Sequence, residues 1–171
     1  MPPRQIANTL FYKIISSPVG SLTLVASDKA LVYLGWGAKL PQAIAKNLEL
    51  ASPSNCKLLQ DAETQLNEYF LGKRTSFDIP VAPSGTEFQK RAWAQLLDIP
   101  YGSTISYRQQ ASMIGKPTAA RAIGAANGKN PIAIIVPCHR VIGVSGKLTG
   151  FAGGLGIKQK LLAFEKYYLK D

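Results

Sequence analysis

The run IAIIVPCHRVI, residues 132–142, places a buried segment next to two reactive side chains. Its first five residues are apolar and mostly β-branched and follow an Asn-Pro pair, a pattern typical of a short buried strand. Pro137 has no N–H to donate and ends that strand. Cys138 and His139, the only histidine of the chain, come directly after it. We therefore predict a strand over 132–136 that leads a thiol and an imidazole into an irregular turn.

Cys138 and His139 are open to two interpretations. Neighbouring residues alternate sides on a strand and do not face each other on a helix, so the two can cooperate only across an irregular turn, through a water molecule. In the first interpretation Cys138 is a small core residue and His139 a structural histidine. In the second, the imidazole takes the proton of the thiol and leaves a nucleophilic thiolate.

Composition and charge narrow the class of protein. The 171 residues suffice for one large domain or two small ones, and 46% hydrophobic with 18% charged residues is typical of a globular protein. A net charge of +10 favours a polyanionic partner, nucleic acid above all, although a merely basic surface would give the same value. No apolar run is long enough to cross a membrane, so we expect no membrane partner.

The chain has two cysteines, Cys56 and Cys138, too far apart in sequence to suggest a disulfide framework. Residues 1–5 lack the apolar core of a signal peptide, and together these features predict a reducing, cytoplasmic location. With one histidine, the chain lacks the ligands of a structural zinc site, so we expect no metal. Cys56 lies in a polar loop rich in serine, proline and asparagine and has no predicted role.

Residues 1–85 have the pattern of an α/β domain. Alternating, β-branched segments predict an antiparallel meander of three strands at 9–16, 21–26 and 31–34. A helix is predicted over 58–71, because apolar residues recur at helical spacing and Gly72 follows as a C-cap. The proline- and glycine-containing segment 77–85 indicates a linker, where we place the domain boundary.

Residues 86–171 begin with three short helices. Thr86 and Ser106 each open a capping box, with glutamine three residues later, and start helices that end near residues 99 and 114. A Gly-Lys-Pro break follows, and Thr118 starts a third helix that runs to about residue 127. Two helices around a glycine-containing turn form either a helix-turn-helix or an ordinary helical hairpin; with the strand and turn after them, the unit is typical of a winged helix.

Two charged residues lie among small or apolar side chains on one face of a helix. The third helix has alanines and glycines around Arg121. Either these small residues allow close packing with Arg121 in solvent, or they form a smooth surface in a DNA groove while Arg121 enters the base stack. The last helix, predicted over 155–169, has an apolar stripe that includes Glu165, which is either a charge at its edge or the partner of His139.

The hexapeptide PCHRVI at 137–142 resembles the signature of the O6-alkylguanine-DNA alkyltransferases, as do RAIG at 121–124 and LLAFE at 161–165. The resemblance is strong over 86–168 and loose before it. It implies an α+β protein with an N-terminal domain at 1–85 that is ribonuclease H-like, of α/β type with antiparallel strands. A C-terminal winged helix-turn-helix domain at 86–171 would bind DNA and carry the active site.

The resemblance implies a DNA repair protein that flips O6-alkylguanine out of duplex DNA and transfers the alkyl group irreversibly to Cys138, once per molecule. His139 would take the thiol proton, and Glu165 would hold the imidazole. Asn130 would tie the helix-turn-helix to the active-site strand, and Tyr107 would give a proton to the departing guanine. We expect a monomer that uses no cofactor.

The same resemblance implies the contacts to DNA and to the flipped base. Arg121 would fill the vacated stack, with its helix in the minor groove and no sequence preference. The implied DNA contacts are Arg121, Tyr107, Thr118, Ala119 and Ala120. The implied base pocket consists of Val141, Phe151, Ala152 and Lys158, and the carbonyls of Cys138 and Val141 would read the guanine amino group. The family's Tyr-Ser-Gly-Gly or Tyr-Ala-Gly-Gly loop is FAGG here, which loses a hydroxyl but keeps the Ala152 N–H.

Three other functions fit parts of the pattern. Alkyltransferase-like proteins bind lesions without reacting, but they lack the cysteine that is Cys138 here. A winged-helix transcription regulator reads bases with polar side chains, and the helix around Arg121 offers almost none. A cysteine hydrolase needs an oxyanion hole, which this motif does not supply.

Overall fold

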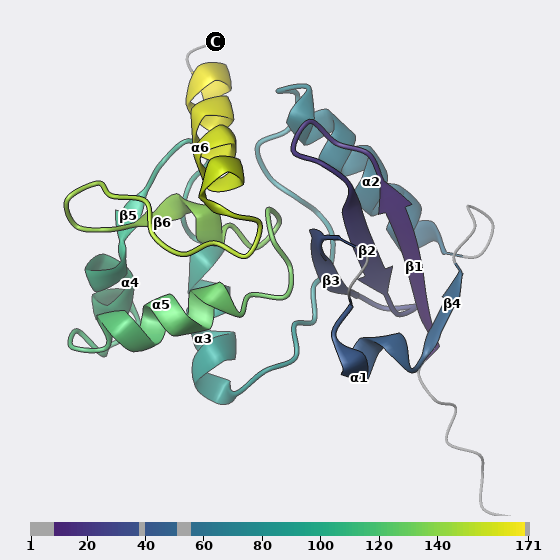
Figure 1. Cartoon of the computed structure of the whole chain (residues 1–171), viewed down its shortest axis with the longest axis horizontal. Coiled ribbons are helices and arrows are strands. Elements are labelled where there is room, and N and C mark those ends of the chain that lie inside the picture. The colour runs from purple at the N-terminus through teal and green to yellow at the C-terminus, as the bar shows by residue number, and fades with distance from the viewer. Residues whose placement is uncertain (1–8, 38–39, 51–55, 170–171) are drawn as a thin grey trace, which may run out of the picture.

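The computed structural model describes residues 9–37, 40–50 and 56–169. A sheet with one long helix against it lies beside a cluster of helices that includes the C-terminal helix (Figure 1). None of the described helices is long and apolar enough to cross a membrane. Two expectations, on the signal peptide at 1–5 and on the polar loop before Cys56, concern residues outside the described ranges.

The sheet contains the three strands that were predicted and a fourth that was not. Strands β1 (Leu10–Ile15), β2 (Leu22–Ala26) and β3 (Leu31–Trp36) pair antiparallel, which confirms the meander. The sheet order is β3-β2-β1-β4, and β4 (Leu48–Leu50) pairs parallel with β1 after the short helix α1 (Gln42–Ala45). A three-residue strand is too short to show alternation, so its sequence gives no signal.

Helix α2 (Lys57–Phe70) packs on the sheet through the apolar stripe that its sequence predicted. The buried residues are Leu59, Ala62, Leu66, Tyr69 and Phe70. Gly72 follows with φ of 71°, in the left-handed region that a helix end requires. Cys56 is the N-cap residue of α2 and is buried, because the start of the helix lies against the core.

The segment 77–85 is attached to the sheet rather than free of it. The Leu31 N–H donates to the Pro80 carbonyl, and the Ala82 N–H donates to the Leu31 carbonyl, both at 2.9 Å. Leu31 and Val81 form an isolated parallel bridge. The linker therefore uses hydrogen-bonding groups of β3 that an open edge would leave unpaired.

The second half contains the predicted helices. Helix α3 (Glu87–Leu96) and helix α4 (Tyr107–Met113) both start at complete capping boxes. Helix α5 (Ala120–Gly128) begins two residues after the predicted start and packs against α3 and α4. Helix α6 (Leu155–Leu169) has the predicted bounds. The short strands β5 (Ile105–Ser106) and β6 (Val141–Ile142) pair parallel, and the predicted α+β class is confirmed.

The predicted strand over 132–136 is wrong. Its five residues are buried, as expected, but only Ile132 makes a bridge, with Leu34 of β3. The chain then turns: the Val136 N–H donates to the Ile132 carbonyl at 3.1 Å, and Ile134 has φ of 70°. A short apolar run signals burial, not conformation. Here contacts with the sheet and the Asn130 side chain select a turn.

Candidate active site

Cys138 begins the 3-10 helix η1 (Cys138–Arg140) and is 8% exposed as a free thiol. The turn before it is held by Asn130. The Asn130 amide nitrogen donates to the Val136 carbonyl at 2.8 Å, and its oxygen accepts from the Ile132 N–H at 3.0 Å. Both ends of the turn are thus tied to one side chain that follows α5, which places Cys138 relative to the helix-turn-helix.

His139 and Glu165 are brought together by the packing of α6 on η1. His139 Nε2 lies 2.7 Å from Glu165 Oε1, and both side chains are fully buried. Burial lowers the pKa of His139, although Glu165 opposes this, so the ring is neutral near pH 7. Nε2 then carries the proton that is shared with Glu165, and Nδ1 is a free acceptor. Nδ1 is buried without a protein partner among the described residues.

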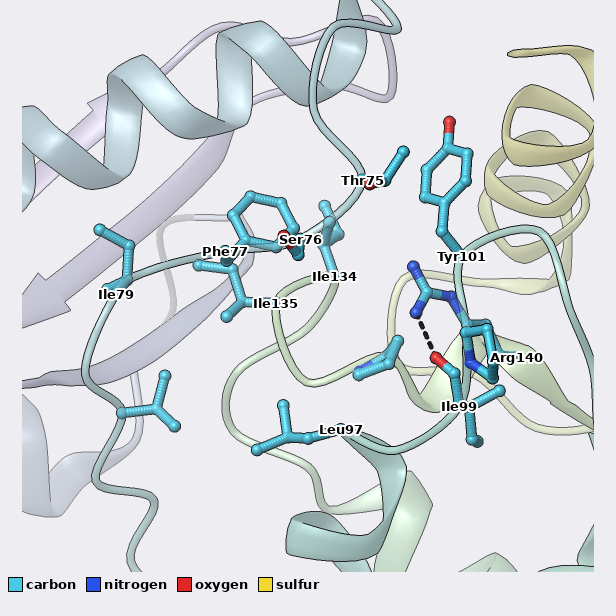
Figure 2. A pocket seen from close by; sticks show the side chains of 13 residues that line it. Thr75, Ser76, Phe77, Ile79, Leu97, Ile99, Tyr101, Ile134, Ile135 and Arg140 are labelled. Carbon is cyan, nitrogen blue, oxygen red and sulfur yellow. Dashed lines mark hydrogen bonds between the residues drawn. The ribbon is translucent and has the colours of Figure 1, made fainter. Parts of the chain in front are cut away.

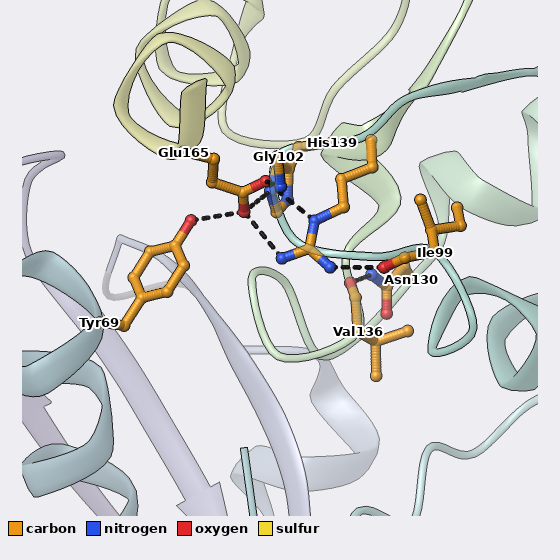
Figure 3. A network of polar contacts seen from close by, with 8 residues as sticks. Tyr69, Ile99, Gly102, Asn130, Val136, His139 and Glu165 are labelled. Atoms are coloured by element: carbon orange, nitrogen blue, oxygen red, sulfur yellow. Dashed lines mark hydrogen bonds and ion pairs between the residues drawn. The ribbon is translucent and has the colours of Figure 1, made fainter. Parts of the chain in front are cut away.

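The Glu165 carboxylate accepts four further hydrogen bonds (Figure 3). Arg140 binds both oxygens, with Nε and Nη2 each at 2.9 Å. The Tyr69 hydroxyl donates to Oε1 at 2.8 Å, and the Gly102 N–H donates to Oε2 at 3.2 Å. Burial alone would raise the pKa of Glu165, but the hydrogen bonds from His139 and Arg140 outweigh it and hold the pKa at about 2.

The Cys138 thiol is protonated in this arrangement. Burial raises its pKa above the ordinary value, while the Asn130 amide and the charge of Lys158 act in the opposite direction. Lys158 is itself fully buried. Its Nζ donates to the Val141 carbonyl at 2.7 Å, the Thr149 carbonyl at 3.0 Å and the Tyr107 hydroxyl at 3.3 Å. The Val141 carbonyl, expected to read the guanine, thus already accepts one hydrogen bond.

A cavity of about 410 Å³ opens between α5 and the loop before α6. Its lining residues are Tyr107, Ala120, Arg121, Gly124, Thr149 and Gly150. Three of the predicted DNA contacts line this cavity: Tyr107, Ala120 and Arg121. Of the other two, Thr118 is exposed and Ala119 is half-buried. Cys138 does not line this cavity.

The expected pocket loop at 151–154 is only partly exposed. Phe151 is half-buried against Trp36 of β3, with ring centroids 5.4 Å apart, whereas Ala152 is exposed. The sheet thus contacts this loop through the Trp36 ring. A second cavity of about 410 Å³ is lined by Ile134 and Ile135 of the turn before η1 (Figure 2). Arg140 also lines it and donates to the Ile99 carbonyl.

Among the residues that the structure describes, no three histidine, cysteine, aspartate or glutamate side chains come together as metal ligands. The polar groups near Cys138 are instead hydrogen-bond donors, acceptors and a buried ammonium. They suit nucleophilic attack by sulfur and proton transfer.

Two family models match almost the whole described chain. The model of the 6-O-methylguanine DNA methyltransferase ribonuclease-like domain matches residues 10–83, and that of the DNA binding domain matches residues 87–167. The chain belongs to the 6-O-methylguanine DNA methyltransferase family. A relative from Methanosarcina barkeri, named methylated-DNA--protein-cysteine methyltransferase, is 48% identical over 163 residues, which cover 94% of this chain and all of the relative.

Solved structures of family members resemble the fold. Mycobacterium tuberculosis OGT in complex with DNA is 47% identical with a TM-score of 0.85, covering 92% of this chain and 94% of that one. The M. tuberculosis O6-methylguanine methyltransferase is 46% identical with a TM-score of 0.84, covering 94% of each chain.

Two residues of this family site were missed by reasoning from the sequence. Arg140 follows His139 in the motif, and a charged residue inside an otherwise apolar run was a usable signal for a buried ion pair. Tyr69 had no such signal, because a tyrosine on the apolar stripe of α2 has the pattern of a core residue. Its partner, Glu165, is 96 residues away in sequence.

Proposed function

We propose that this chain repairs DNA by moving the alkyl group of O6-alkylguanine to the sulfur of Cys138. The observation that carries the proposal is the placement of Cys138 beside the buried His139–Glu165 pair in a chain of this family. In the transfer, the bond between sulfur and the alkyl carbon forms as the carbon–O6 bond breaks. The bonding electron pair stays on O6, and the guanine takes up one proton.

The thiol proton goes to His139 in this proposal. Nδ1 is the free acceptor of the neutral ring, and a water molecule between Sγ and Nδ1 would carry the proton across. Glu165 stabilises the imidazolium that results, as a buried carboxylate does for the histidine of a catalytic triad. Because burial raises the pKa of Cys138, the thiol is protonated at rest and must lose its proton in the transfer.

Tyr107 is the proposed donor to the departing guanine. Its hydroxyl lies 3.3 Å from the ammonium of Lys158, and a cation beside a phenol stabilises the phenolate left after proton transfer. In the resting structure the hydroxyl donates to the Thr149 carbonyl at 3.0 Å. The incoming base would therefore have to replace that carbonyl as the acceptor.

Helix α5 is the proposed contact to the minor groove of duplex DNA. Ala119 and Ala120 let the backbone approach the groove, and Thr118 lies beside them. Arg121 is exposed at the cavity edge, where it can enter the stack when the base is flipped out. Twelve of the twenty lysines and arginines lie in residues 86–171, which supports binding through phosphates without sequence preference.

The base would then lie near Val141, Phe151, Ala152 and Lys158. We propose that the protein acts as a cytoplasmic monomer. The product is a thioether, whose sulfur is a poor leaving group, so each molecule reacts once. A lesion-binding module would leave Cys138 unchanged, and a transcription regulator would prefer one undamaged sequence.

The intact mass of the protein tests this proposal. After incubation with excess duplex DNA that carries O6-methylguanine, the mass should rise by one methyl group on the peptide with Cys138. The amount of repaired guanine should stop increasing at one per protein molecule. An unchanged mass, or repair that continues past that point, would contradict the proposal.

A further inference from the structure

We infer that Tyr69 is a positioning residue through which the N-terminal half sets the proton affinity of His139. Its hydroxyl donates to Glu165 Oε1 at 2.8 Å, the same oxygen that faces His139 Nε2 at 2.7 Å. Tyr69 lies on α2, whereas both partners belong to the C-terminal half (Figure 3). The relevance of this contact to alkyl transfer rests on the proposed function; the contact itself does not.

Packing alone does not account for a tyrosine at position 69. The ring is fully buried, with the rings of Phe70, Phe77 and Phe164 as near neighbours at centroid distances of 5.2–5.6 Å. A phenylalanine would fill that space equally well. A buried phenol hydroxyl costs free energy unless it finds an acceptor, and here the acceptor is the carboxylate. The hydroxyl therefore acts on Glu165.

The direction of the effect follows from charge. The Tyr69 hydroxyl, as a donor to Oε1, stabilises the ionised carboxylate of Glu165. The same hydrogen bond makes Oε1 a weaker acceptor, so it stabilises an imidazolium at His139 less. Without the hydroxyl, the pKa of Glu165 rises, and the pKa of His139 rises with it. Both changes make the pair more basic.

Other titratable groups face this pair and stay in place when the hydroxyl is removed. The groups are Arg140 on η1, Lys158 on α6, and Tyr101 before β5. Arg140 keeps its two bonds to the carboxylate, so Glu165 remains ionised and oriented. The change is therefore a shift in basicity and not a collapse of the site.

Tyr69→Phe tests the inference directly, and Tyr101→Phe is its matched control. Tyr101 is also buried, and its ring lies 6.0 Å from that of Tyr69, but its hydroxyl has no hydrogen-bond partner among the described residues. Because the chain has one histidine, the ring ¹⁵N shifts of a tag-free protein report His139 alone. Tyr69→Phe should raise the pKa of His139 by about 0.5–1 unit, and Tyr101→Phe should leave it unchanged. An equal pKa in the wild type and Tyr69→Phe would overturn the inference.

A second variant covers the case in which Tyr69→Phe does not fold. Difluorotyrosine at position 69 keeps the hydroxyl and makes it a stronger donor, so the pKa of His139 should fall, and a rise would overturn the inference. In reactions with free O6-benzylguanine, the acid limb of the pH–rate profile should move to higher pH in Tyr69→Phe. If the wild type transfers nothing, the proposed function fails, while the titration of His139 still decides the role of Tyr69.

Discussion

The two halves of the chain differ in charge and in chemistry. Residues 86–171 contain twelve lysines and arginines against four acidic residues, whereas residues 1–85 contain eight against six. Cys138, His139 and Glu165 all lie in the second half. Yet most of the buried apolar side chains of both halves form one continuous core, beside a smaller cluster among α3, α4 and α5. The candidate site residues thus belong to one half, whereas the side chains packed around them come from both.

Three contacts from the first half reach the site. Leu34 pairs with Ile132 in the turn before Cys138, Tyr69 binds Glu165, and Trp36 packs on Phe151. A Cβ added at Gly153 would lie 2.8 Å from the Trp36 ring, so the loop and the sheet touch closely. The difference between the halves teaches that residues far from Cys138 in sequence can still fix the positions of the groups around it.

Replacing each of the two cysteines by serine, one in each half, should give the largest difference in alkyl transfer. Cys138→Ser should lose all alkyl transfer, because a serine hydroxyl is far less nucleophilic than a thiolate, and should keep duplex binding. Cys56→Ser should keep transfer, because this residue is the N-cap of α2, a position where serine is favoured. The measurement is methyl transfer from labelled DNA, with binding followed separately. Transfer by Cys138→Ser would show that the acceptor lies elsewhere.

Glu165→Gln should destabilise the fold by about 3–5 kcal/mol at pH 7, because it leaves Arg140 as a buried charge without its counter-ion. The pKa of Glu165 is about 2 in the folded protein, against an ordinary value of 4.5. The stabilisation from the ionised Glu165 is therefore complete above pH 4.5 and is lost as the pH falls towards 2. Denaturant unfolding of both proteins at pH 7 and pH 3 measures this. The gap between wild type and Glu165→Gln should narrow at pH 3, and a constant gap would contradict the ionised pair.

Arg121→Ala should slow repair of duplex DNA by about a hundredfold and leave the reaction with free O6-benzylguanine nearly unchanged. Only the duplex reaction has to offset the unstacking of a base, a few kcal/mol. Lys129→Ala removes the same charge at the end of α5 and should slow the duplex reaction much less. Equal slowing on both substrates would instead assign Arg121 to folding or to the chemical step.

Glu63→Gln should have the smallest effect, below about 1 kcal/mol in unfolding free energy, with no change in transfer. Glu63 pairs with Lys13 on the N-terminal half, and both side chains remain about 30% exposed. Solvent screens such pairs, unlike the buried pair of Glu165. A destabilisation as large as that of Glu165→Gln would mean that the N-terminal surface is energetically coupled to the site.

The sequence by itself determined the features that depend on neighbours along the chain. The capping boxes at Thr86 and Ser106 and the bounds of α6 were predicted correctly, because each rests on residues within a few turns. Cys138 and His139 were selected as candidates for the same reason, because they are neighbours in the sequence. The roles of the site residues in DNA repair remain predictions.

Only the tertiary structure decided the features that depend on distant contacts. The segment 132–136 became a turn because it bridges to β3, and β4 pairs with β1 across a separate helix. The carboxylate of Glu165 acquired donors from Tyr69 and Gly102, which lie 96 and 63 residues away. Local propensity cannot anticipate such contacts, because they form when two apolar surfaces pack and a buried polar group must take whichever partner that packing supplies.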